Sequence, residues 1–437
     1  MMLSPKAFLL QECANVRDVL DETLRYKYGA DGSKDFYDEC LIRLESTEAG
    51  IKGCEEGDHS QLTAFSKLLQ RLTYLIARIE RSSIGEYSWP FVEELKDLAA
   101  GICSEATLAD DSTPPQIHVL SQGEFGYSID PEQSRPSASR RKILTIVLPR
   151  TLKHFVLLHA ILGHEIGHAI YANAKHQRHL KHVRRTHLGK TGNVLESSAT
   201  TAARMFDKDA PFLVKQHLIS RSMRQEADLY RFSDWDAWVE EVLCDLIGLV
   251  SFGPSYVAAA WHLLLAMDPT GLRWGPDHPP IAWRLNMLLD GASILGMDTV
   301  SSGDPGTDAA AKSFWDAIRN KRYADPWCDI IDRASLTDAL NEIKALLDVH
   351  PPAAYPSNPD RLLPGLLNDL GHLVPPAGFA VEQDDSLTLE QIDFRHILYA
   401  GWIHGHSTDI DQKTLNRLCE HAIMQQRAIK KFQGTTA

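Results

Sequence analysis

The stretch "HAILGHEIGHAIYAN", residues 159–173, decides which fold the sequence predicts. It places His164 and His168 four residues apart, and Glu165 directly follows the first histidine. Side chains four residues apart on a helix lie on one face, so both imidazoles can occupy two corners of a zinc tetrahedron. Glu165 projects about 100° around the helix from His164, where it can take a proton from a zinc-activated water without binding the metal. The stretch therefore predicts a helix that carries a zinc site.

An ordinary amphipathic helix that happens to carry histidines is the alternative. The flanking residues are apolar, so we expect the histidine face to be buried, and buried imidazoles need polar partners. Gly163 and Gly167 lower helix stability, and small residues there would let a strand or a substrate approach closely. Both features favour the metal site.

A catalytic zinc site needs a third protein ligand and an open coordination position. The metzincin arrangement would place glycine and histidine three and six residues after His168, but this chain has Tyr171 and Ala174 there, which excludes it. The segment "WDAWVEEVLCDLIGLV", residues 235–250, has the pattern of an apolar helix that carries carboxylates. It is the better source of the missing ligand.

Within that helix, Glu241 and Asp245 are four residues apart and share a face. We predict that Glu241 is the third ligand and that Asp245 accepts the other ring N–H of a ligand histidine, which fixes the tautomer. Glu240, Glu196 and Glu226 are alternatives for the ligand. The remaining alternative, a pair of surface carboxylates, is weakened by the apolar flanks of the helix.

HExxH followed by a distant ExxxD helix resembles the gluzincin metallopeptidases, and is most similar to the branch of the CAAX prenyl protease and the HtpX-like enzymes. The segment "DHPPIAWRL", residues 277–285, resembles the HPxxxxR element of that branch, and the resemblance covers roughly residues 142–290. It implies a zincin fold with Zn²⁺, in which His278 stabilises the oxyanion and Arg284 holds its segment or the substrate. His278 capping a helix before Pro279 is the alternative. Members of the branch are commonly embedded in membranes, and this chain departs from them in lacking clear spans.

Charge and hydropathy limit the partners that we expect. The 437 residues carry a formal charge of −13, so the surface on average repels nucleic acid and anionic membranes. The basic run at residues 174–190 has few interleaved aromatics, and we interpret it as a solvated helix extension, with steering of an acidic substrate as an alternative. Gly253 and Pro254 interrupt the apolar stretch at residues 246–267, which predicts two buried helices instead of a membrane span. We therefore expect neither nucleic-acid binding nor stable membrane insertion.

Cysteine usage indicates a reducing compartment. The seven cysteines are scattered and never form a CxxC pair, which argues against a disulfide framework and against a cysteine-based zinc site. The N-terminal residues soon become charged and do not resemble a signal peptide. We expect a cytoplasmic protein.

The pattern along the chain predicts an α+β fold that is predominantly α-helical, in three parts. Residues 1–110 have helical periodicity and predict an N-terminal helical region. Residues 111–296 contain the motifs and predict a zincin-like catalytic domain with a small sheet. Residues 297–437 predict a C-terminal helical region, whose helices are separated by proline-rich breaks.

Residues rich in β-branched side chains predict the strands of the small sheet. They occur at residues 116–120 and 142–150, and residues 123–129 can add a third strand. We expect residues 142–150 to form an edge strand, to which a peptide substrate could add by backbone hydrogen bonds. An ordinary core strand is the alternative.

Together these features predict a zinc-dependent metallopeptidase that hydrolyses peptide bonds of a protein or peptide substrate. Glu165 is the predicted general base and acid, while Tyr256 joins His278 and Arg284 as a candidate for stabilising the tetrahedral intermediate. The alternative is a catalytically inactive, zinc-stabilised scaffold or regulatory protein. The intact Glu165 counts against it, because a purely structural site has no need of that carboxylate.

Overall fold

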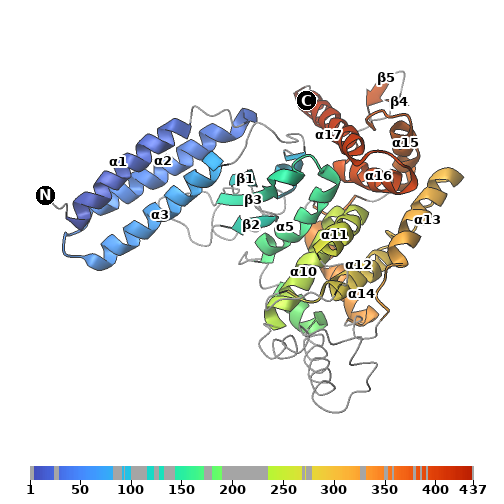
Figure 1. Cartoon of the computed structure of the whole chain (residues 1–437), viewed down its shortest axis with the longest axis horizontal. Coiled ribbons are helices and arrows are strands. Elements are labelled where there is room, and N and C mark those ends of the chain that lie inside the picture. Colours follow the sequence, from blue (N-terminus) through green and yellow to red (C-terminus); the bar gives the residue numbers. More distant parts are fainter. Residues whose placement is uncertain are drawn as a thin grey trace, which may run out of the picture. The chain divides into compact units, whose positions relative to one another are not determined.

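The computed structural model describes residues 4–23, 29–81, 91–92, 94–99, 116–122, 127–131, 143–171, 180–188, 235–267, 271, 278–324, 331–348, 353–356, 359–376, 380–383, 386–389 and 392–435 (Figure 1). Its contacts divide the chain into two compact units, Met1–His154 and Phe155–Ala437. Most of the described residues are helical, which confirms the prediction of a predominantly helical protein. The division at 154/155 differs from the predicted boundaries near residues 110 and 296.

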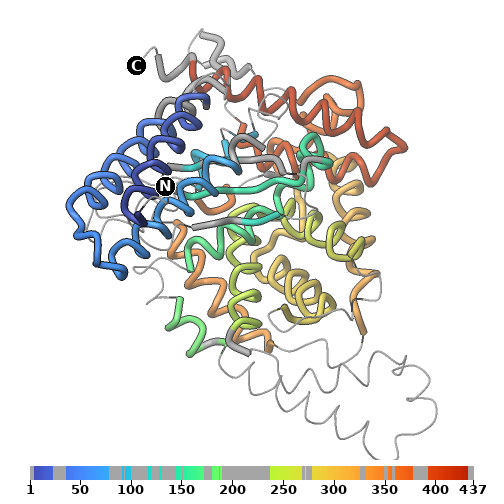
Figure 2. The backbone as a smooth tube through the Cα atoms, turned by 60° about the vertical axis from the view of Figure 1, so that its left-hand side comes forward, coloured from blue at the N-terminus to red at the C-terminus, as the bar shows by residue number. Residues whose placement is uncertain are grey.

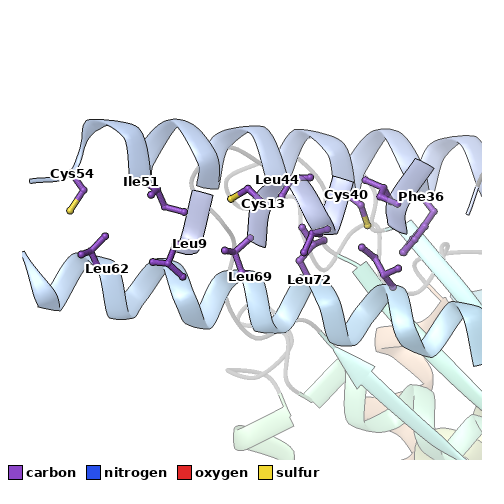
Figure 3. Packing of buried hydrophobic residues seen from close by; sticks show 13 residues of the cluster. Leu9, Cys13, Phe36, Cys40, Leu44, Ile51, Cys54, Leu62, Leu69 and Leu72 are labelled. Carbon is purple, nitrogen blue, oxygen red and sulfur yellow. The ribbon is translucent and has the colours of Figure 1, made fainter. Parts of the chain in front are cut away.

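Three helices of the first unit pack around a shared apolar core and run alongside one another (Figures 1 and 2). They are α1 (Pro5–Thr23), α2 (Gly29–Gly53) and α3 (His59–Arg81). Figure 3 shows Cys13, Cys40 and Cys54 among the leucines of this core, and none of the three forms a disulfide. Burial raises the pKa of Cys13 to about 11, so this sulfur serves as a small apolar packing group.

The first unit also contains a three-stranded sheet with the order β1-β3-β2. Its strands are β1 (Gln116–Gln122), β2 (Ser128–Pro131) and β3 (Ile143–Pro149). β1 runs parallel to β3, with Ile117 opposite Leu144, and β2 runs antiparallel to β3, with Ile129 opposite Ile146. Since β3 has a partner on each side, the expectation that it forms an edge strand for a peptide is wrong. Its unbroken buried run from Leu144 to Pro149 is typical of a central strand.

The second unit is built from helices, with a small hairpin near its end (Figure 1). Its elements are η2 (Val156–Ile161), α5 (Leu162–Tyr171), η3 (Arg184–Leu188), α10 (Trp235–Phe252), α11 (Pro254–Met267), α12 (Ile281–Ile294), α13 (Pro305–Arg319), α14 (Arg333–Asp348), α15 (Pro359–Gly371), β4 (Ala380–Gln383), β5 (Ser386–Leu389), α16 (Phe394–Ser407) and α17 (Gln412–Thr435). α10 ends and α11 begins on either side of Gly253, whose φ is 61°, as the Gly-Pro pair predicted. None of the helices in the described part of the chain combines the length and the hydropathy that a membrane span requires.

The C-terminal helices share a core with the motif-bearing helices, which is why the contacts place them in one unit. The Asn416 side chain on α17 accepts a hydrogen bond from the Leu157 N–H, and the Trp402 indole on α16 donates one to the Leu157 carbonyl. The buried Arg395 guanidinium donates to the Ser251 and Ala353 carbonyls. These polar contacts anchor the segment that leads into α5 and the end of α10.

α5 and α10 approach each other more closely than helices with ordinary side chains at the contact. A Cβ atom on Gly163 would lie 2.8 Å from the Gly248 Cα, and one on Gly167 would lie 2.8 Å from the Cys244 Cα. The two glycines were predicted to let a strand or a substrate approach closely, and the segment that approaches them is the helix α10.

Replacing Gly167 with alanine is expected to destabilise the second unit. Alanine in an exposed helix would add up to about 1 kcal/mol of stability, but here the new methyl group meets backbone atoms, so overpacking should cost roughly 1–3 kcal/mol. Chemical denaturation followed by circular dichroism measures the change. Gly371→Ala is the matched control, since a Cβ atom there meets nothing within 4 Å. Equal stability of the two variants would contradict the close contact.

His396 gives the second unit a predicted sensitivity to acid. The Tyr355 hydroxyl and His396 Nδ1 are hydrogen-bonded at 3.0 Å. Burial lowers the pKa of this imidazole to about 4, the charge of Asp393 raises it and that of Arg395 lowers it. In the unfolded chain this histidine has an ordinary pKa, so it binds a proton at a higher pH than in the folded chain. The contribution of His396 to the free energy of unfolding is therefore fully present above about pH 6.5 and is lost as the pH drops toward 4.

The expected loss is on the order of 3 kcal/mol between pH 6.5 and pH 4. His396→Asn keeps a hydrogen-bonding partner for Tyr355 and removes the titrating group, so this part of the pH dependence should disappear. Denaturant midpoints between pH 4 and pH 8 measure it, with exposed His421→Asn as the control. A wild-type stability that is flat over this range would show that His396 stays accessible to protons.

Candidate metal centre

α5 presents two histidines whose Nε2 atoms face each other. The His164 and His168 Nε2 atoms are 3.2 Å apart, and the two rings are nearly perpendicular, at 87°. His164 is buried and His168 half-buried. The spacing of four residues on a helix accounts for this pairing.

Glu241 from α10 completes a group of three ligands. Its Oε2 lies 3.1 Å from His164 Nε2, and its Oε1 lies 3.1 Å from His168 Nε2. Around a zinc ion with bonds of about 2.0–2.1 Å, tetrahedral ligand atoms are about 3.3 Å apart, close to the distances seen here. The three residues can therefore hold a metal ion.

The net charge of the group and one buried carboxylate oxygen without a hydrogen bond among the described residues are both consistent with a bound divalent cation. Glu241 Oε2 is buried and makes no hydrogen bond to any described residue. With both histidines in the neutral form that binds metal, the buried ionic groups Glu241, Asp245 and Arg284 sum to one negative charge, and the half-buried Glu165 adds a second. Burying uncompensated charge is costly, so a dication would stabilise this arrangement.

Asp245 connects the histidine pair to two further residues behind it. Its Oδ1 lies 2.9 Å from His164 Nδ1, as predicted, and this contact leaves the Nε2 lone pair free for a metal. Arg284 donates two hydrogen bonds to the same carboxylate, at 2.7 and 2.8 Å, and Tyr256 donates a third at 2.6 Å. Burial raises the pKa of Asp245, but Arg284 and His164 more than offset it, so the pKa is well below the usual range.

The other ring nitrogen of His168 has neighbours that the sequence interpretation missed. His168 Nδ1 lies 3.4 Å from Glu240 Oε1 and 3.4 Å from Cys244 Sγ. Glu240 thus lies behind a ligand instead of serving as one. A signal was present, because Glu240 and Cys244 are four residues apart and share a face, just as Glu241 and Asp245 do.

Glu165 follows His164 on α5 and is half-buried, outside the group of three ligands. Burial raises the pKa of its carboxyl, and the two histidines partly offset that effect. For Glu241, burial raises the pKa, and the adjacent His164 and His168 lower it by more than burial raises it, so the carboxylate stays ionised. The pKa values of the two glutamates are therefore shifted in opposite directions within one site.

The structure separates the residues of the HPxxxxR element. His278 has 62% of its side chain exposed, and its Nε2 lies 3.7 Å from Glu241 Oε2, so it stands at the solvent side of the ligand group. Arg284 and Tyr256 are buried and directed at Asp245, which makes both of them supports for that carboxylate. Glu196, Glu226 and residues 174–179 and 189–190 of the basic run lie outside the described residues.

Glu241→Gln is expected to weaken metal binding by at least about 100-fold, because an amide oxygen is a poor substitute for a charged ligand. The neighbouring Glu240→Gln removes only a partner of His168. It should weaken metal binding less than Glu241→Gln does, by about 10–100-fold at most. Elemental mass spectrometry after dialysis against a graded chelator measures both. Metal that stays bound equally well to the two variants would move the third ligand away from Glu241.

Comparisons of the chain with protein-family models, with curated proteins and with solved structures give no match. The gluzincin resemblance therefore rests on the motifs of this chain alone.

Proposed function

We propose that the protein is a zinc-dependent metallopeptidase, in which His164, His168 and Glu241 hold the zinc ion. The observation that carries the proposal is a three-ligand group that keeps a side toward solvent. His168 retains 27% side-chain exposure, and the group contains three ligands among the residues described. Structural zinc sites are normally closed by four protein ligands, whereas catalytic sites keep one position open.

The residues around the ligand group have the chemistry that peptide hydrolysis needs. A bound zinc ion would polarise the substrate carbonyl and lower the pKa of a water molecule. Glu165, adjacent to a ligand but not one itself, takes the proton from the attacking water and passes it to the leaving amine. His278, exposed beside Glu241, can donate a hydrogen bond to the developing oxyanion.

Residues behind the ligand group orient the ligand histidines. Asp245 fixes the His164 ring, and Arg284 and Tyr256 hold Asp245 in place. On the other ligand, Glu240 lies close to His168. Such partners determine which ring nitrogen carries the proton and therefore which one faces the metal.

The test is cleavage of a diverse peptide library by the full-length protein, read out by mass spectrometry of the new termini. We expect cleavage that a zinc chelator abolishes and that added zinc restores. The same preparation carrying His164→Ala and His168→Ala is the blank for contaminating proteases. Cleavage that is absent, or equal in the blank, would contradict the proposal.

A further inference from the structure

The second unit contains a pocket that no residue of the metal centre lines. It has a volume of about 320 Å³ and is lined mainly by residues of η2, α11, α13, α16 and α17. Its walls are mainly apolar and aromatic, and include Leu157, Trp261, Phe314, Trp402 and Leu415. A volume of this size is at the lower end of the range that holds small organic ligands, about 300–1,000 Å³.

The polar groups of this pocket are basic or neutral, although the chain as a whole carries a charge of −13. Lys321, His262 and His406 line it, and none of its lining residues is an aspartate or a glutamate. Lys321 forms no salt bridge with any residue in the described part of the chain. Burial and the nearby Lys321 both lower the pKa of His262, so the lysine supplies the positive charge.

Aromatic side chains form part of the pocket wall. Trp261 lines the pocket and is 4% exposed. Trp402 and His262 add aromatic faces, with ring centroids 5.6 Å apart.

We propose that this pocket binds a small aromatic carboxylate, with its ring against Trp261 and Trp402 and its carboxylate at Lys321. Aromatic rings prefer such aromatic walls beyond the gain from buried area alone. The ammonium–carboxylate hydrogen bond is stronger than a neutral one. The proposal concerns a binding site separate from the metal centre and does not depend on peptidase activity.

Isothermal titration calorimetry of the full-length protein with three matched probes tests the proposal. They are 1-naphthaleneacetate, its uncharged amide and 1-naphthylmethylammonium. We expect the carboxylate to bind at least about 10-fold more tightly than the amide, and the ammonium not to bind. Lys321→Gln should make the carboxylate and the amide equal, whereas Lys312→Gln, on α13 but outside the pocket, should leave the preference unchanged.

Ala317→Phe, which adds a ring to the wall contributed by α13, should abolish binding of all three probes. The thermal unfolding curve of Ala317→Phe checks that this variant keeps its fold. Lys321→Gln changes an exposed residue, so it tests the charge preference even if Ala317→Phe does not fold. Equal binding of carboxylate and amide by the wild type would overturn the proposal. The proposal would also be overturned if the wild type bound neither the carboxylate nor the amide, or if Lys321→Gln still bound the carboxylate more tightly than the amide.

Discussion

Glu165→Gln is expected to lower kcat for peptide hydrolysis by roughly 10²–10⁴-fold while leaving the zinc content unchanged. Glutamine has nearly the same size and polarity but cannot accept the proton of the attacking water. Since Glu165 lies outside the three-ligand group, its replacement does not remove a metal ligand. Steady-state kinetics on the best library peptide, together with elemental analysis of the same sample, measures both quantities.

Glu240→Gln is the matched control for this experiment, because it changes another carboxylate close to a ligand histidine. With zinc in excess, we expect its kcat to stay within about tenfold of the wild type, since its role is to orient His168. If Glu165→Gln and the wild type behave alike on every substrate, the enzyme proposal fails. A zinc-stabilised scaffold would then be the better description.

Asp245→Ala is expected to lower the free energy of unfolding of the second unit by on the order of 5 kcal/mol. Asp245 is fully buried and accepts hydrogen bonds from Arg284 and Tyr256. Removing it leaves a buried guanidinium without its main charge partner, which costs about 3–5 kcal/mol, and a tyrosine hydroxyl without an acceptor, which adds about 1–3 kcal/mol. Denaturant titration in the presence of chelator measures the change without a contribution from metal binding.

A compensating double variant separates lost charge balance from lost packing. In Asp245→Val with Arg284→Met, both partners become apolar, and much of the stability should return. Zinc binding should remain weakened in the double variant, because His164 has lost the group that orients it. A single Asp245→Ala variant as stable as the wild type would show that Arg284 finds another counter-charge.

The sequence predicted those parts of the site that depend on local spacing. His164, His168, Glu241 and Asp245 lie four residues apart in pairs on two helices, so helical geometry alone assigns them to shared faces. Arg284 was also found, through its motif, but its partner was not. Its contact with Asp245 joins α12 to α10, and no short-range pattern encodes which carboxylate a distant arginine meets.

The same limit applied to the architecture. The positions of β1 and β3 followed from β-branched residues, but the place of β3 at the centre of the sheet depends on which strands pair with it. Helical periodicity identified the C-terminal helices without indicating what covers their apolar faces. The hydrogen bonds from Asn416 and Trp402 to Leu157 explain why these helices belong to the unit that carries α5.

The glycine contacts between α5 and α10 set a lower limit on the size of the candidate metal centre. An added Cβ atom at Gly163 or Gly167 would meet backbone atoms of α10, so no substitution at these two positions can bring the two helices nearer. A larger residue there can only push the helices apart and lengthen the distance between the histidines and Glu241. A descendant protein that needed a tighter site would therefore have to change the ligands themselves, because glycine is already the smallest residue.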